Sequence, residues 1–247
     1  MSAAVVMWME ITFNLAYLAV VWTLVGVMAR RLPNVAPEDA RLAKLFIAAF
    51  GLLALGDTGH VGLRVWAYAL GDLGATAALG NWRLGLVGLG ALATAVTVTF
   101  FYVLMLFIWQ MRFKKPLGGF GVALLATAVV RLLLMLPAAN QWHSVVPPQP
   151  WAIIRNLPLM IMGLGVAYLI LRDARATGDR LFTRIGVMIL VSYAFYAPVI
   201  FFVQRAPMLG MLMIPKTLAY VAIALLAYRG LFRAPAPVGR LATGVGD

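Results

Sequence analysis

Seven long runs of hydrophobic residues alternate with short polar segments along the chain. Each run is long enough to cross about 30 Å of hydrocarbon as an α-helix, at about 1.5 Å per residue. The pattern predicts an all-α, polytopic membrane protein with seven transmembrane helices, at residues 4–29, 43–69, 83–111, 117–138, 151–172, 181–204 and 208–231. Residues 1–233 would form one transmembrane domain, and the Pro- and Gly-rich residues 234–247 a short disordered tail.

The composition indicates that a bilayer, and not water, surrounds this fold. Hydrophobic residues make up 64% of the chain and charged residues only 11%, whereas soluble domains are about 45–50% apolar and about 25% charged. The net charge of +12 does not indicate nucleic-acid binding, because the basic residues cluster in a pattern that fixes membrane orientation. Cysteine is absent, which excludes disulfides and thiolate metal sites.

The loops at the two ends of the predicted helices differ sharply in charge. One set carries most of the basic residues, namely Arg30, Arg31, Arg41, Lys44, Arg112, Lys114, Lys115, Arg172, Arg175, Arg180, Arg184, Arg229, Arg233 and Arg240. The opposite loops, 70–82 and 139–150, contain neither Lys nor Arg. The positive-inside rule then places the N-terminus outside and the C-terminus in the cytoplasm. We therefore expect a multi-pass protein of the inner (cytoplasmic) membrane, with the lipid bilayer as its constant partner.

A carboxylate, an imidazole and a guanidinium share one face of the second predicted helix, within the run GDTGHVGLR at residues 56–64. Asp57, His60 and Arg64 are spaced i, i+3 and i+7, so they fall within roughly 60° of one another on a helix. Ionisable groups at bilayer depth are costly and are therefore candidates for a functional site. We predict that Asp57 and His60 form a buried proton-titrating pair. Small residues beside them would let a neighbouring helix approach closely, namely Gly51, Gly56, Gly59 and Gly62.

Polar side chains from six of the predicted helices fall in the outer half of the membrane. Counted from the outer helix ends at about 1.5 Å per residue, their depths are roughly 6–18 Å. They are Glu10, Asp57, His60, Arg64, Arg131, Arg155, Tyr196 and Lys216. The inner half has almost no ionisable residue, so this one-sided placement predicts a polar cavity open to the outside.

Cations outnumber carboxylates in this layer, so we expect some of them to meet an anion that is not protein. The predicted ligand-binding residues are Glu10, Arg64, Arg131, Arg155, Tyr196 and Lys216. The ligand would be a lipid headgroup, a fatty acid or a small organic anion, because a guanidinium suits carboxylate and phosphate groups. An alternative is an internal salt-bridge network that pairs Asp57 with His60 and Arg131, and Glu10 with Arg64.

A receptor or sensor is the function that these features favour, since a transported anion would need a polar exit through the inner half. A receptor of this size would work with a partner protein or as a homo-oligomer. A proton-linked small-solute transporter is an alternative, and so are a membrane-embedded enzyme and a structural subunit of a complex. The chain offers no nucleophile–base–orienter signature and only two histidines. We therefore assign no catalytic residue and no metal site.

The chain also shows similarity between its two halves. Residues 39–44 (DARLAK) parallel residues 179–184 (DRLFTR), and residues 99–103 (TFFYV) parallel residues 217–221 (TLAYV). These matches predict a 3+1+3 arrangement, in which two three-helix halves are joined by a linking fourth helix. Such parallel repeats occur in transporters, where the site lies between the halves.

Two resemblances accompany these patterns. The run Gly-Asp-x-x-His-x-x-x-Arg, which begins at Gly56, resembles a stretch in uncharacterised seven-helix membrane proteins of bacteria, and this implies no activity. The seven helices, the outside N-terminus and Lys216 in the last helix look like the broad group of SWEET-type transporters and microbial rhodopsins. The rhodopsin resemblance implies retinal on Lys216, with Asp57 or Glu10 as counter-ion because the third helix has no carboxylate. No other cofactor is expected.

Overall fold

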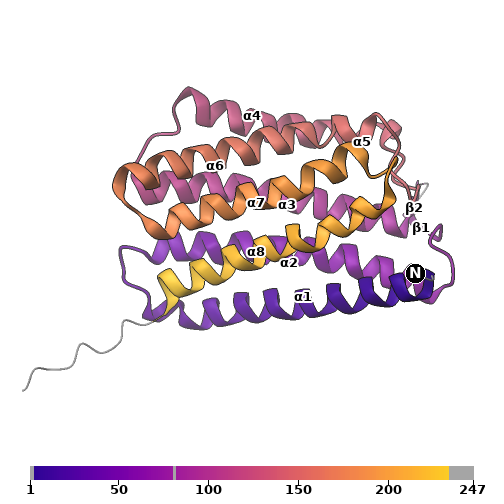
Figure 1. Cartoon of the computed structure of the whole chain (residues 1–247), viewed down its shortest axis with the longest axis horizontal. Helices are drawn as coiled ribbons and strands as arrows, with labels where there is room; N and C mark the ends of the chain where they lie inside the picture. The colour runs from indigo at the N-terminus through magenta and orange to yellow at the C-terminus, as the bar shows by residue number, and fades with distance from the viewer. Residues whose placement is uncertain (1–2, 80–81, 234–247) are drawn as a thin grey trace, which may run out of the picture.

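The helices lie side by side along the long axis of the molecule (Figure 1). The computed structural model describes residues 3–79 and 82–233, so the predicted tail 234–247 lies outside the described residues. In that part of the chain, six helical segments are long and apolar enough to cross a membrane: Met7–Asn34, Ala40–Ala69, Leu86–Phe113, Trp151–Thr177, Arg180–Phe202 and Pro207–Phe232. A shorter apolar helix, Gly118–Leu134, has 17 residues. An all-α, multi-pass membrane protein is therefore confirmed, whereas a seventh crossing stays a prediction.

The helices and strands follow one another in a simple order. The elements are α1 (Ala3–Arg31), η1 (Leu32–Asn34), α2 (Ala40–Ala69), β1 (Thr76–Leu79), β2 (Trp82–Gly85), α3 (Leu86–Phe113), α4 (Gly118–Leu134), η2 (Ala138–Asn140), α5 (Trp151–Ile154), α6 (Leu157–Thr177), α7 (Arg180–Phe202), η3 (Pro207–Leu212), α8 (Met213–Ala227) and the π-helical turn η4 (Tyr228–Phe232). Helices suit a bilayer because every backbone hydrogen bond closes within the segment.

Local sequence sets the tight turn between α6 and α7. Gly178 follows α6 with φ of 69°, a left-handed conformation that glycine adopts at little cost. Asp179 then caps α7, because its Oδ1 accepts a hydrogen bond of 3.0 Å from the backbone N–H of Phe182. The short turn makes the two helices antiparallel neighbours.

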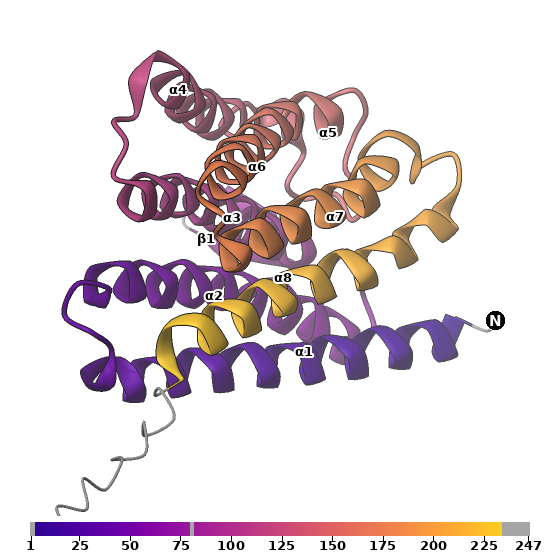
Figure 2. The ribbon, with the colours of Figure 1, turned by 60° about the vertical axis from the view of Figure 1, so that its left-hand side comes forward.

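The bundle closes because the last helix returns to the first. Helices α1, α2 and α3 pack in succession, α4 contacts α3 and α6, and α6, α7 and α8 again pack in succession. Helix α8 lies between α7 and α1 and contacts α1 and α2 (Figure 2). The 3+1+3 repeat stays a prediction, since this packing order alone does not distinguish two repeated halves from a bundle without a repeat.

The two ends of the bundle differ in character. We call one the hairpin end, where the start of α1, the β1–β2 hairpin and α5 gather (Figure 1). We call the other the basic end, where α1 ends at Arg31, α3 ends beside Lys114 and Lys115, and η4 carries Arg229. All the predicted site residues belong to the half nearer the hairpin end.

Helices α2 and α3 approach most closely at glycines. A Cβ on Gly90 would lie 2.8 Å from the Cα of His60, and one on Gly56 would lie 2.8 Å from the Cβ of Thr97. Gly59 also faces α3, with Ala93 at 3.4 Å from its Cβ position. The predicted close approach is confirmed at Gly56 and Gly59. It is wrong at the other two predicted positions, Gly51 and Gly62, where nothing among the described residues lies within 4 Å.

The structure corrects the start of the third predicted helix. Strands β1 and β2 pair antiparallel, with Thr76 opposite Gly85 and Leu79 opposite Trp82, so α3 begins at Leu86 and not at residue 83. The sequence does carry a signal for this, because Gly-Asn at 80–81 separates the two strands as a two-residue hairpin connection does. The loop 139–150 covers this end of α3, since a Cβ on Gly85 would lie 2.7 Å from the carbonyl oxygen of His143.

Three other predicted spans also differ from the structure. The fourth is shorter, because α4 ends at Leu134 and not at residue 138. The fifth is interrupted at Arg155 and Asn156, between α5 and α6, and then continues to Thr177 in place of residue 172. The seventh begins as the 3-10 helix η3 and becomes α-helical only at Met213. Pro215 therefore lies in the first turn of α8, where its missing N–H costs no hydrogen bond.

We expect Gly90→Ala to destabilise the protein, because its new methyl group meets the backbone of α2 at His60. Overpacking of this kind costs about 1–3 kcal/mol. Gly51→Ala is the matched control: its methyl group enters open space, and alanine favours a helix over glycine by roughly 0.5–1 kcal/mol. Thermal unfolding in detergent should show a lower Tm for Gly90→Ala and an unchanged or higher Tm for Gly51→Ala. Equal effects of the two substitutions would contradict this interface.

Candidate functional site

Arg131 on α4 is the most deeply buried cation of the predicted site, with 2% of its surface exposed. Its Nη2 donates a hydrogen bond of 3.4 Å to the Oδ1 of Asn156, whereas Nε and Nη1 are buried without a hydrogen-bond partner. Among residues 3–79 and 82–233, no carboxylate lies within 4.0 Å of the guanidinium. A buried charge costs several kcal/mol when nothing compensates it.

The break between α5 and α6 supplies the partner of Arg131. Asn156 lies in this break and its Nδ2 donates to the backbone oxygen of Ala152 at 2.7 Å, which fixes the orientation of the amide. Its Oδ1 accepts from Arg131 and from the Tyr196 hydroxyl, the latter at 3.2 Å. One amide oxygen thus joins α4, α6 and α7.

Arg155, the other residue of this break, is a second buried cation, with 7% of its surface exposed. Its Nη1 donates to the Oδ1 of Asn140 at 3.2 Å, and its guanidinium carbon lies 4.3 Å from the centroid of the Trp142 ring. Asn140 is itself held by the backbone oxygen of Leu134 at 2.8 Å. The loop after α4 therefore positions Arg155 through an amide and an aromatic face, both of which are neutral.

Lys216 on α8 is surrounded by tyrosines. Its Nζ lies 4.7 Å from the centroid of the Tyr196 ring and 5.3 Å from that of Tyr220. The Tyr220 hydroxyl is hydrogen bonded to that of Tyr102 at 2.8 Å. Within the described chain no carboxylate comes within 4.0 Å of the ammonium, so Lys216 has ring faces in place of an ion-pair partner.

Asp57 on α2 is held by hydroxyl groups from both neighbouring helices. The Tyr17 hydroxyl of α1 donates to Oδ2 at 2.7 Å, and Thr94 Oγ1 of α3 donates to Oδ1 at 2.6 Å. The alternative that paired Asp57 with His60 and Arg131 is wrong, because neither side chain brings a nitrogen within 4.0 Å of a carboxylate oxygen of Asp57. The Nδ1 of His60 is buried without a hydrogen-bond partner.

Glu10 and Arg64 neutralise each other between α1 and α2. Arg64 Nε lies 2.7 Å from Glu10 Oε1, Nη2 donates to Oε2 at 3.3 Å, and the Tyr68 hydroxyl donates to Oε2 at 3.4 Å. This half of the predicted salt-bridge network is confirmed. The side chains of Arg64 and Glu10 are 26% and 31% exposed, so the pair lies toward the rim of the bundle.

The predicted layer thus separates into a first part, in which Glu10 pairs with Arg64 and hydroxyl groups hold Asp57, and a second part that carries only positive charge. The second part, which we call the cationic cluster, consists of Arg131, Arg155 and Lys216 with Tyr196. The predicted ligand-binding residues did not include Asn140, Asn156 and Tyr220, although their side chains contact these cations. The fifth span was predicted without a break, and Pro158 in the first turn of α6 is the signal for a helix start that would have indicated Asn156 before it.

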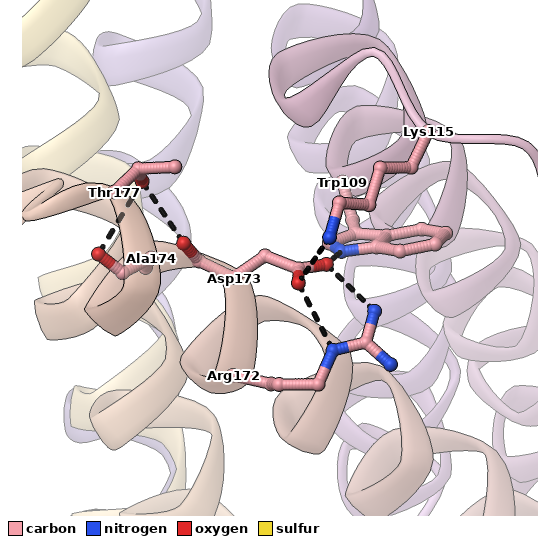
Figure 3. A network of polar contacts seen from close by, with 6 residues as sticks. All are labelled: Trp109, Lys115, Arg172, Asp173, Ala174 and Thr177. Atoms are coloured by element: carbon pink, nitrogen blue, oxygen red, sulfur yellow. Dashed lines mark hydrogen bonds and ion pairs between the residues drawn. The ribbon is translucent and has the colours of Figure 1, made fainter.

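A different polar network lies at the basic end and is fully paired (Figure 3). The carboxylate of Asp173 is 2% exposed and accepts hydrogen bonds of 2.8 Å from Trp109 Nε1, 2.8 Å from Lys115 Nζ and 2.9 Å from Arg172. This network was not predicted, because the fifth span was expected to end at residue 172, one residue before Asp173. Asp173 shows how the protein compensates a buried charge when it uses its own residues.

Two cavities in the described part of the chain lie at the basic end, away from the cationic cluster. One of about 400 Å³ lies between α7 and α8, and one of about 420 Å³ lies beside Arg112 and Lys115. In the cluster, Tyr196 and Lys216 are only half-buried, so part of their surface remains accessible. No group of three or more His, Cys, Asp or Glu in the described chain could hold a metal ion.

Comparisons with known proteins find no relative of this chain. No protein-family model, no curated protein and no solved structure matches the chain. The resemblance to bacterial seven-helix proteins and to the SWEET and rhodopsin group therefore stays a prediction. The function has to be argued from the geometry of the side chains.

Proposed function

We propose that this chain binds an anionic or amphipathic small ligand through the cationic cluster, as a membrane receptor or sensor. The observation that carries the proposal is the burial of Arg131 with two donor nitrogens unused and no carboxylate of the described chain within 4.0 Å. Structures satisfy nearly all buried polar groups, so donors left free point to a partner from outside the chain.

The chemistry of the cluster indicates what that partner carries. Nε and Nη1 are the two free donor nitrogens of the Arg131 guanidinium, and an oxygen of a carboxylate or phosphate can accept a hydrogen bond from either of them. Arg155 and Lys216 add positive charge, and the Tyr196 hydroxyl adds a polar group. A fatty acid, a phospholipid headgroup or a small organic anion fits this donor set.

We further infer the orientation of the protein. Helix ends and loops rich in Arg and Lys lie at the basic end, whereas the loop 139–150 at the hairpin end contains neither residue. The positive-inside rule would place the basic end in the cytoplasm, with α4 as a seventh crossing of the inner membrane. The cationic cluster would then be reached from the outer side.

The packing of the half of the bundle nearer the basic end favours a receptor over a transporter. Large side chains fill this half, among them Phe46, Phe182 and Met105, which are completely buried. The Asp173 network joins α3 and α6 beside them. An anion that entered from the hairpin end would therefore meet a packed apolar core, and transport would require these helices to separate.

Single cysteines introduced into this cysteine-free chain test the orientation. Val146→Cys lies in the loop 139–150, where Val146 is 62% exposed, and Arg175→Cys lies at the exposed basic end. A membrane-impermeant maleimide applied to intact cells should label Val146→Cys, whereas Arg175→Cys should react only after the membrane is opened. The parent chain is the unlabelled control, and the reverse labelling pattern would contradict the orientation.

Arg131→Met tests the anion site. Native mass spectrometry of gently solubilised wild-type protein should show a bound anionic mass that this variant loses. Added oleate should raise the Tm of the wild type and bind the variant at least about 10-fold more weakly, since a hydrogen bond to a charged group contributes about 1.5–3 kcal/mol. Without ligand, Arg131→Met should unfold at an equal or higher temperature, because it removes an uncompensated buried charge.

Arg180→Ala is the matched control, because it removes an exposed arginine at the basic end. It should keep the bound mass and the response to oleate. Bare wild-type protein without any response to oleate, or equal losses in both variants, would contradict the anion site. A covalent adduct that disappears only in Lys216→Ala would replace the proposal with a retinal-type protein.

A further inference from the structure

A groove between α7 and α8 lies near the basic end, far from the cationic cluster. It encloses about 400 Å³ and combines two basic side chains with an apolar lining. The residues that matter for the argument are Arg184, Val187 and Met188 from α7, and Leu225, Leu226 and Arg229 from α8 and η4.

The polar and apolar side chains are separated along the groove. On α7, which begins at the basic end, Arg184 comes one turn before Val187 and Met188. On the antiparallel α8, which ends there, Arg229 follows Leu225 by one turn. Both arginines therefore lie at the same end of the groove, and the apolar residues lie deeper by about 5 Å, one helical turn.

Neither arginine forms an ion pair with the described residues. Both side chains are exposed, and in the part of the chain that the structure describes no carboxylate lies within 4.0 Å of either one. Two guanidinium groups without an ion pair form a site for a phosphate group, which they can bind through paired hydrogen bonds. Basic pockets between transmembrane helices at the cytoplasmic side bind anionic headgroups in this way.

Exposed hydrophobic surface continues from the groove toward the middle of the bundle. Val187 is 36% exposed, Leu190 on α7 is 40% exposed and Leu218 on α8 is 52% exposed. Such a surface suits a hydrocarbon chain, whereas a free phosphate ion would make no use of it. The arrangement of charge at one end and apolar surface beyond it matches an amphiphile.

We propose that this groove binds an anionic phospholipid of the leaflet at the basic end. Arg184 and Arg229 hold its phosphate, and one acyl chain lies over Val187, Met188 and Leu225. The site is independent of the proposed anion site, because no residue of the cationic cluster lines the groove. Either proposal can therefore fail without the other.

The test uses the full chain in nanodiscs that contain equal amounts of phosphatidylglycerol and phosphatidylcholine. Native mass spectrometry should show wild-type protein that retains phosphatidylglycerol preferentially. The double variant Arg184→Ala/Arg229→Ala should weaken this retention about 30-fold, from about 1 kcal/mol for each arginine near an anionic headgroup. The matched control Arg175→Ala/Arg180→Ala removes two exposed arginines at the same end that do not line the groove.

A second variant tests the apolar part without changing charge. Ala222 lines the deeper part of the groove, and Ala222→Phe should fill it and release the lipid while Arg131-dependent anion binding persists. Equal losses in the control double variant would overturn the site in favour of diffuse surface charge. Unchanged retention in Ala222→Phe, or a second copy of the chain bound in place of lipid, would also overturn it.

Discussion

The burial of the Arg131 charge is the constraint on which the polar half of this bundle depends. A guanidinium in a low-dielectric interior costs several kcal/mol unless hydrogen bonds and an opposite charge compensate it. The guanidinium donates one long hydrogen bond to the Oδ1 of Asn156 and has no carboxylate of the described chain within 4.0 Å. Arg155 and Lys216 are supported by neutral amides and aromatic rings, which hold their positions without cancelling their charge. The buried positive charge therefore remains uncompensated within the described chain, and a bound anion would lower its electrostatic free energy.

Asp173 at the basic end makes the contrast clear. Its carboxylate is as deeply buried as Arg131, yet it accepts hydrogen bonds from an indole, an ammonium and a guanidinium, two of which carry positive charge. Glu10 and Arg64 likewise neutralise each other at the rim. The chain thus pairs Asp173 and Glu10 with opposite charges, whereas Arg131, Arg155 and Lys216 have no carboxylate of the described residues within 4.0 Å, and this contrast favours a binding site over an imperfectly packed core.

Hydropathy predicted most of the fold because the length and apolar character of a transmembrane helix are local properties. The β1–β2 hairpin was missed although Gly-Asn at residues 80–81 is a recognised turn signal, and α6 was cut short before Asp173. The depths counted from the outer helix ends correctly placed Arg131, Tyr196 and Lys216 in the same half of the bundle. It could not identify their partners, because Asn156 reaches Arg131 and Tyr196 only through the helix break and the packing of α4, α6 and α7. Pairing of this kind depends on helix rotation, which the hydrophobic pattern leaves undetermined.

A high-resolution experimental structure of the protein, extracted with its native lipids, tests the central claim most directly. The account predicts density from a non-protein anion within hydrogen-bond distance of the Nε or Nη1 of Arg131. It would be contradicted by a guanidinium paired with a carboxylate of the chain itself, such as Asp57, because the charge would then be compensated without a ligand. Ordered water alone beside Arg131 would contradict it as well, since water satisfies the donors but leaves the charge unopposed.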